Sequence, residues 1–201
     1  MRNSRLPTDV LALVPSKGCG GGIEAYTRGV LGAVEATGIR VLELPLSESH
    51  IRLTRWRKAS YLLDVVRRSF SLRSRDVEVI CFHPGLITVG LAARVVLGRS
   101  TPVTAFFYGA DIWGAGPIAR RVREFRPIRR VAISSFSAGA LSDGGTPLLL
   151  PPAVDEKLHK QLLDLSRPPA MKSGLKVLSV FRLADYVAKG GPELVEAVEA
   201  L

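Results

Sequence analysis

The stretch "DVLALVPSKGCGGGIEAYTRGV", residues 9–30, decides the fold expected for this chain. Residues 9–15 are mostly apolar, which is typical of a strand buried on both faces of a sheet. Glycine then occupies four of the five positions 18–22, and a helix-like segment follows over about 22–37. A buried strand, a glycine-rich turn and a helix form the first unit of a parallel α/β sheet.

The same alternation continues along the chain. We expect five further strands, each a short apolar run, at 39–44, 77–82, 102–108, 129–135 and 146–152. Helical segments lie between them, and the one within 52–70 is expected to gather its large apolar residues on one face: Trp56, Tyr61, Leu62, Val65 and Val66. The pattern predicts a Rossmann-like, doubly wound parallel sheet.

A second unit is expected near the end of the chain. The polar segment 155–174 contains Pro-Pro and ends in Ser-Gly, as inter-domain linkers often do. A new buried strand is predicted at 175–181, and a helix begins near 191. We therefore expect residues 1–165 to form a Rossmann-like domain, and residues 166–201 to hold the linker and first βα unit of a truncated second Rossmann-like domain.

Positive charge is concentrated in two segments. The formal charge is +10, and half of the 28 basic residues lie in 52–75 and 120–130. Such clusters favour an anionic partner, either phospholipid or nucleic acid, although a solvated arginine-rich helix face is an equal alternative. Only two cysteines are present, and no signal peptide or spanning run is recognised, so we expect a cytoplasmic protein. A peripheral contact with the inner membrane face would suit the basic segments.

The glycine loop predicts a ligand, because ligands of such sheets bind beyond the carboxyl ends of the strands. A P-loop is excluded, since no Gly-Lys pair occurs in the sequence. A dinucleotide fingerprint remains open: Gly20, Gly22 and Ala25 fit its spacing, and Glu43 stands where an acid would bind ribose. A third interpretation places Gly20, Gly21 and Gly22 against the diphosphate of a sugar nucleotide. A turn without a ligand is the fourth.

Other candidate residues follow the third and fourth predicted strands. His83 follows the third, and Tyr108, Asp111 and Trp113 follow the fourth, so all are expected to face the same crevice as the loop. An indole on which a sugar ring stacks and a carboxylate that accepts hydroxyl hydrogens suit carbohydrate binding. A tight turn at Asp111 with Trp113 in the core, and a structural His83, are the alternatives.

Two further motifs bear on chemistry. "SFSAG" at 135–139 resembles a nucleophile elbow around Ser137 but has serine where glycine is required, so we expect Ser134 or Ser135 to cap a helix instead. "FRLADYVAKGG" at 181–191 places Arg182 and Lys189 around a predicted βα loop. Two cations there would clamp a departing diphosphate, and two solvated charges without a ligand are the alternative.

The order of these motifs resembles that of the retaining glycosyltransferases of family 4, which have the GT-B fold. The resemblance rests on segments spread over most of the chain: "GGIEAYTRGV", "YGADIW", "AISSFSAGAL", "LLLPPAVDEKLH" and "VFRLADYVAKGGPELVEAVEAL". It implies an acceptor-binding N-terminal half and a second half that binds a nucleotide-sugar donor. In that case Gly21 and Gly22 would lie against the donor phosphates, and Arg182 and Lys189 would neutralise the leaving diphosphate.

The resemblance also implies that no metal or other cofactor is needed. The sequence departs from the family pattern at Tyr108, where the family often has histidine, and at Ala153, where it usually has glycine. The family's acidic donor-binding motif would lie beyond Leu201, so we do not expect this chain to catalyse transfer alone. A basic Rossmann-like binding module without chemistry, for nucleic acid or a partner chain, and a nicotinamide-dependent oxidoreductase are the alternative functions.

Overall fold

The computed structural model describes most of one α/β unit. The described residues are 6–18, 21–48, 54–108, 112, 128–141, 145–152, 160, 192 and 195–197. The chain divides into two units, Met1–Glu156 and Lys157–Leu201, and all elements discussed below belong to the first. Most of the predicted second domain, 166–201, lies outside the described residues, so its fold and its boundary stay predictions.

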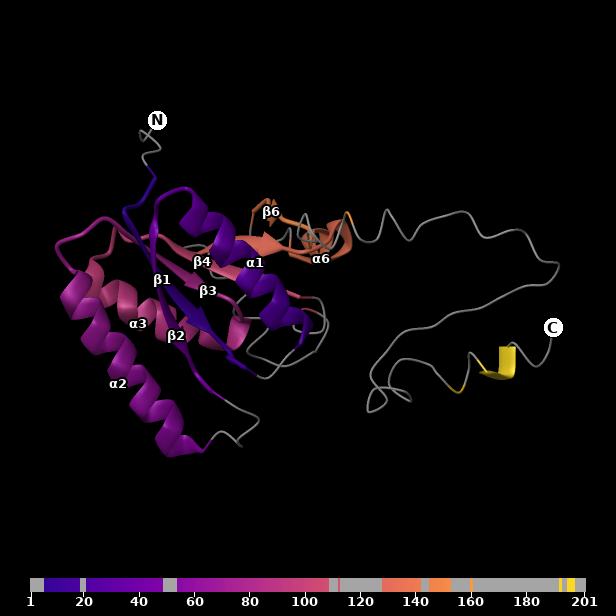
Figure 1. Cartoon of the computed structure of the whole chain (residues 1–201), viewed down its shortest axis with the longest axis horizontal. Coiled ribbons are helices and arrows are strands. Elements are labelled where there is room, and N and C mark those ends of the chain that lie inside the picture. Colours follow the sequence, from indigo (N-terminus) through magenta and orange to yellow (C-terminus); the bar gives the residue numbers. More distant parts are fainter. Residues whose placement is uncertain are drawn as a thin grey trace. The chain divides into compact units, whose positions relative to one another are not determined.

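The first unit is built on a six-stranded parallel sheet (Figure 1). Its strands are β1 Asp9–Val14, β2 Arg40–Pro45, β3 Val77–Cys81, β4 Val103–Phe107, β5 Arg129–Ala132 and β6 Leu148–Leu149. Their order across the sheet is β2-β1-β3-β4-β5-β6, and each neighbouring pair is parallel. The chain moves outward from β1 to β2 and then crosses back to β3, which makes the β1–β3 border a topological switch point. The predicted Rossmann-like sheet is thus confirmed.

Helices cover both faces of this sheet. They are α1 Gly22–Ala36, α2 Arg55–Leu72, α3 Ile87–Leu97 and α6 Ser135–Ala140, with a short 3-10 helix, η1, at Pro84–Leu86. Residues of α1 share one hydrophobic cluster with alternate residues of β1, whereas α2, α3 and α6 share the other cluster. The strand β1 is buried at every position, because both of its faces are covered. No helix of the described residues is long and apolar enough to span a bilayer.

The packing of α3 on the sheet depends on one glycine. A Cβ atom added to Gly90 would lie 2.5 Å from the Sγ atom of Cys81 and 3.5 Å from side-chain carbons of Val79 and Val103. Cys81 is fully buried, and its thiol lies 3.7 Å from the carbonyl oxygen of Leu86, to which it donates. Burial raises the pKa of Cys81 to about 12, so the thiol stays protonated and unreactive at neutral pH.

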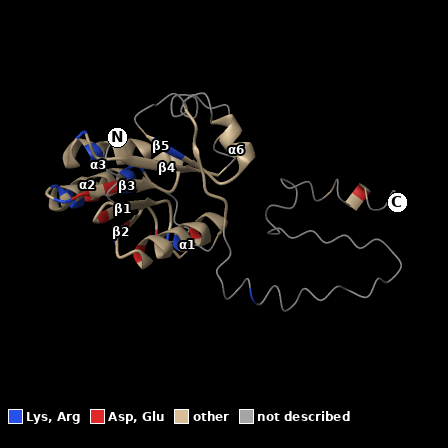
Figure 2. Cartoon of the chain, turned by 90° about the horizontal axis from the view of Figure 1, so that it is seen from above, with Lys and Arg blue, Asp and Glu red and all other residues tan. Residues whose placement is uncertain are grey.

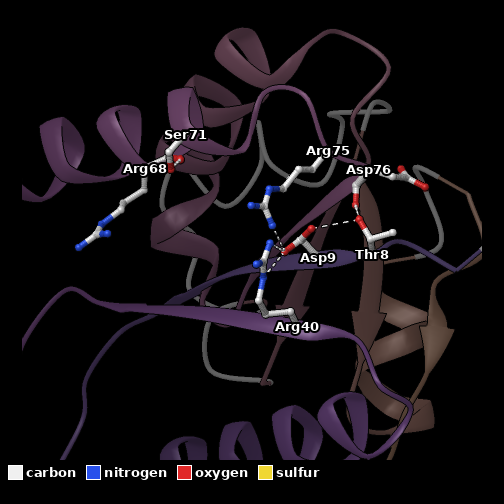
Figure 3. A network of polar contacts seen from close by, with 7 residues as sticks. All are labelled: Thr8, Asp9, Arg40, Arg68, Ser71, Arg75 and Asp76. Carbon is white, nitrogen blue, oxygen red and sulfur yellow. Dashed lines mark hydrogen bonds and ion pairs between the residues drawn. The ribbon is translucent and has the colours of Figure 1, made fainter.

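A buried carboxylate organises the amino end of the sheet (Figure 3). Asp9 is only 4% exposed, and Arg40 of β2 and Arg75 before β3 both pair with its Oδ1 atom, the latter at 3.6 Å. Thr8 donates its hydroxyl to the Asp76 carbonyl oxygen at 3.0 Å. These contacts join the starts of three neighbouring strands. We assign a structural role to Asp9, Arg40 and Arg75, because a buried carboxylate needs positively charged partners.

The inner face of α2 differs from the face predicted for it. Its buried residues are Tyr61, Val65, Ser69 and Leu72, whereas Trp56 and Leu62 are exposed. Ser69 is tolerated there because its hydroxyl donates to the Val65 carbonyl oxygen at 2.8 Å. The prediction was right for Tyr61 and Val65 and wrong for Trp56 and Leu62.

Candidate functional site

The candidate site lies at the carboxyl edge of the sheet. The glycine loop follows β1, His83 follows β3 and Tyr108 follows β4, and the carboxyl ends of parallel strands share one edge. The predicted site residues that the structure describes are Gly21, Gly22, His83 and Tyr108. The others lie outside the described residues: Gly20, Asp111, Trp113, Arg182 and Lys189.

The glycine loop leaves the beginning of α1 bare. Gly21 is the N-cap residue of α1, and no side chain caps the helix there. Gly21 has extended backbone angles, φ −173° and ψ 168°, which any residue can adopt, whereas Gly18 has φ +81° and requires glycine. A Cβ atom added to Gly21 or Gly22 would meet nothing within 4 Å. The described part of the protein therefore gives no steric reason for glycine at these two positions.

Polar and apolar residues together line a cavity of about 580 Å³ beside the loop. Glu24 turns back toward the loop, accepting the Gly18 N–H at 2.9 Å and a guanidinium hydrogen of Arg28 at 3.1 Å. Lys17 pairs with Glu43 of β2 at 2.9 Å. Glu43, the predicted ribose-binding acid of the dinucleotide interpretation, is thus engaged by a lysine of the loop.

One lining residue was missed from the sequence. The hydroxyl oxygen of Thr27 is buried, and among the described residues it finds no hydrogen-bond partner. Thr27 is 4% exposed and borders the same cavity as Lys17. The sequence did contain a signal that Thr27 lines the site. Thr27 stands three positions after Glu24, so the two lie on the same side of the helix, and Lys17 directly precedes the glycines.

His83 has a structural contact at the site. Its Nδ1 atom accepts the backbone N–H of Gly85 at 3.0 Å, which caps the 3-10 helix η1. This bond holds the imidazole ring at the end of β3 and assigns Nδ1 as the acceptor. His83 therefore has the structural role that the sequence analysis gave as an alternative. Its contact with a sugar stays a prediction.

Tyr108 belongs to an aromatic group under α1. Its ring meets that of Tyr26 edge-on, with centroids 5.9 Å apart, and Tyr26 makes a similar contact with Phe106 at 5.8 Å. The Tyr26 hydroxyl donates to the Leu150 carbonyl oxygen at 2.7 Å, and burial raises the pKa of Tyr26. This group joins α1 to the segment after β6 and supports Tyr108 from the side of α1.

Ser137, in the segment after β5, is not an accessible nucleophile. The hydroxyl oxygen of Ser134 accepts the N–H of Ser137 at 3.1 Å and caps α6, as predicted. Ser137 is 1% exposed and lies within the helix, so its hydroxyl is inaccessible to a substrate. The cap expected from Ser134 or Ser135 is thus confirmed for Ser134.

Part of the second basic segment is used in folding. Arg129 lies 3.6 Å from Glu78, and the buried Arg130 donates to the Leu141 carbonyl oxygen at 3.0 Å. Arg130 is therefore used within the fold, whereas the side chain of Arg129 stays 69% exposed, so the contact of this segment with an anionic partner stays a prediction. Positions 120–127 lie outside the described residues. The described residues also contain no group of three or more His, Cys, Asp or Glu side chains able to hold a metal ion.

Comparisons with known proteins give matches to solved structures alone. No protein-family model matches the chain, and no curated protein does. The chain is similar to Anabaena HepE in complex with UDP-glucose, at 15% identity and a TM-score of 0.47, over 79% of this chain and 50% of that one. It is also similar to the lipopolysaccharide outer core galactosyltransferase WaaB, at 16% identity and a TM-score of 0.46, over 68% of this chain and 42% of that one. The chain thus spans about half the length of the solved chains it matches.

Proposed function

We propose that this chain is the N-terminal, acceptor-side part of a GT-B glycosyltransferase of family 4. The enzyme would transfer a sugar from a nucleoside-diphosphate sugar to an acceptor hydroxyl with retention of configuration. One observation carries the proposal: the bare start of α1 at the carboxyl edge, where side chains at Gly21 and Gly22 would meet open space. The order of family-like motifs along the sequence supports it.

The loop suits the donor's diphosphate for electrostatic reasons. The first turn of a helix has N–H groups without intrahelical partners, and the helix dipole favours negative charge there. Because Glu24 is turned toward Gly18 and Arg28, its carboxylate is partly neutralised. Phosphate oxygens could therefore approach the backbone at Gly20, Gly21 and Gly22 closely, which a side chain at these positions would hinder.

The leaving group and the acceptor are assigned to other residues. In this proposal Arg182 and Lys189 neutralise the departing diphosphate, so the chemistry requires no metal or other cofactor. His83, Tyr108, Asp111 and Trp113 would border the acceptor, which is a sugar, a lipid-linked sugar or a small molecule with a hydroxyl group. The cavity at Lys17 and Thr27 adds polar groups to the same edge.

The complete reaction needs a donor half. We propose that residues 166–201 begin that second Rossmann-like domain, and that the 201-residue chain by itself is inactive. We further propose a cytoplasmic location, where nucleotide sugars are available.

The test is a transfer assay on the full-length gene product. Release of nucleoside diphosphate is followed with a panel of donors, beginning with UDP-glucose, the ligand in the HepE structure. Product formed with the same anomeric configuration as the donor, as seen by NMR early in the reaction, is the expected result. Absence of release from every donor, together with steeply salt-dependent DNA binding, would instead favour the non-catalytic basic module. Cofactor binding in a nicotinamide fluorescence titration would favour the oxidoreductase.

A further inference from the structure

The outer face of α2 carries a row of large apolar side chains. Trp56 is 86% exposed, Leu63 is 68% exposed and Phe70 is 58% exposed. Positions seven apart lie almost in line along a helix, since seven residues make just under two turns. The three side chains therefore form one row, on the side opposite the buried Val65. A row of this kind in water is costly unless a partner covers it.

Cations lie on both sides of this row. The basic residues of α2 are Arg55, Arg57, Lys58, Arg67 and Arg68, against the single acid Asp64. At about 100° per residue, Arg67 falls beside the row on one side and Arg55 on the other. Within the described part of the chain, neither makes an ion pair. Figure 2 shows the basic positions of α2 in blue.

We propose that α2 docks lengthwise on an anionic membrane surface. Trp56, Leu63 and Phe70 enter the boundary between headgroups and acyl chains, and Arg55 and Arg67 bind lipid phosphates on either side of them. Guanidinium groups suit this role because they bind phosphate through two parallel hydrogen bonds. An indole is likewise favoured at such an interface, since its ring is apolar and its N–H is polar.

The apolar row and the flanking cations together favour an anionic membrane over other partners of α2. Nucleic acid would attract the cations but would leave the apolar row unpaired. A solvated helix face would account for the arginines but would not place three large apolar side chains in line between them. An anionic bilayer complements both, because phosphates lie above its apolar interior.

The docked helix would keep the candidate site close to the lipid. The helix α2 follows β2 and precedes β3, so its Trp56 end lies toward the carboxyl edge of the sheet. A membrane-associated acceptor could therefore reach that edge from the side. The docking itself rests on α2 alone and does not depend on the proposed transfer reaction.

The test is co-sedimentation of the 201-residue chain with vesicles. We expect binding to phosphatidylcholine vesicles that contain phosphatidylglycerol, weak binding to pure phosphatidylcholine, and release as NaCl is raised. The double variant Leu63→Ser/Phe70→Ser should weaken partitioning by about tenfold or more. Arg67→Gln should weaken it by roughly fivefold, the effect of one cation near an anionic surface.

Matched controls come from other helices. Phe136 on α6 is 71% exposed, so Phe136→Ser removes an exposed aromatic side chain away from α2. Arg28→Gln removes an exposed cation from α1, on the opposite face of the sheet. Both should leave vesicle binding unchanged, and thermal melts confirm that each variant is folded.

Tryptophan fluorescence gives an independent readout. The chain has two tryptophans, so Trp113→Phe leaves Trp56 as the sole reporter. Its emission should shift to the blue on anionic vesicles, and brominated lipids should quench it. The proposal is overturned by no binding at low salt, by binding that the α2 variants leave intact, or by an unshifted Trp56. If instead the α2 variants alter only self-association in ultracentrifugation, the face belongs to a second copy of the chain.

Discussion

Within the described residues, α1 alone covers one face of the sheet, whereas α2, α3 and α6 share the other. On the α1 face, Gly21, Gly22 and Gly29 all have open space where a side chain would stand. On the α3 face, Gly90 is in contact with the sheet so closely that a Cβ atom would overlap the thiol of Cys81. Glycine thus serves opposite purposes on the two faces, leaving room on one and permitting contact on the other.

The helices α1 and α2 differ at their beginnings too. The N-cap residue of α1, Gly21, provides no side-chain cap, whereas the hydroxyl of Thr54 accepts the N–H of Arg57 and caps α2. We interpret the bare end of α1 as ligand space and the outer side of α2 as a docking surface. In this interpretation α1 contacts the ligand at its N-terminus, whereas α2 contacts its partner along its whole length.

The largest expected effect separates the inner and outer sides of α2. Leu72 is 7% exposed and Leu63 is 68% exposed, so the same substitution tests both sides of one helix. Leu72→Ala should lower the free energy of unfolding by about 2–5 kcal/mol through lost burial and a residual cavity. Leu63→Ala should change it by less than about 0.5 kcal/mol. Urea denaturation measures both, and equal losses would contradict the assignment of the two sides.

The next largest expected difference in stability is between alanine substitutions at Gly90 and at Gly29. Gly90→Ala should lower the free energy of unfolding by about 1–3 kcal/mol, because the new methyl group overlaps the Cys81 sulfur. Gly29→Ala on α1 should raise it by about 0.5–1 kcal/mol, since alanine is the better helix former. Adding Cys81→Ala to Gly90→Ala should restore part of the loss. A neutral Gly90→Ala would show that the α3 face is not tightly packed.

Alkaline pH should weaken the same face. The pKa of Cys81 rises from its ordinary 9.0 to about 12 through burial. Above pH 9 the unfolded chain loses the thiol proton while the native chain keeps it, so stability present below pH 9 is lost progressively up to pH 12. At pH 10 the loss is about 1.4 kcal/mol. Urea melts at pH 7 and pH 10 should show this extra loss in the parent and not in Cys81→Ala; equal slopes would refute it.

The smallest expected effect compares the two helix starts. Thr54→Ala removes a hydroxyl that caps α2 and should cost about 1 kcal/mol of unfolding free energy. Gly21→Ala removes no such bond from α1, so about 0.5 kcal/mol is expected. Thermal melts of the two variants give the difference. A cost at Gly21 as large as that at Thr54 would mean that the α1 start is stabilised by its own backbone geometry.

The sequence predicted the sheet well because each strand is a short, nearly continuous apolar run. The strand expected at 9–15 is observed at Asp9–Val14, and the helix expected at 22–37 is Gly22–Ala36. The last strand was expected at 146–152 but comprises Leu148–Leu149 alone. β6 lies at the edge of the sheet, beside β5, and both of its leucines are exposed. The apolar run at 146–152 therefore does not mark a buried strand.

The face of α2 could not be predicted from apolar periodicity. The helix has apolar residues on both sides, and hydrophobicity alone does not distinguish Val65, which packs on the sheet, from Leu63, which faces outward. Ser69 on the inner face depends on a hydrogen bond to its own helix. At the site, the sequence predicted that His83 and Tyr108 follow strands at the carboxyl edge of the sheet, and they do. The bond between His83 and Gly85 is local, whereas the edge-on contact of Tyr108 with Tyr26 arises from tertiary structure and could not be predicted from the sequence.

The most direct test of the proposed ligand space at the start of α1 compares valine substitutions at two glycines of this helix. Gly22 and Gly29 lie seven residues apart on the same helix, and each has open space for a Cβ atom. In the full-length gene product, we predict that Gly22→Val abolishes nucleotide-sugar turnover while Gly29→Val leaves it intact, with both variants melting near the parent temperature. Full activity in a folded Gly22→Val variant would contradict the account, because a side chain would then fit where the donor is proposed to lie.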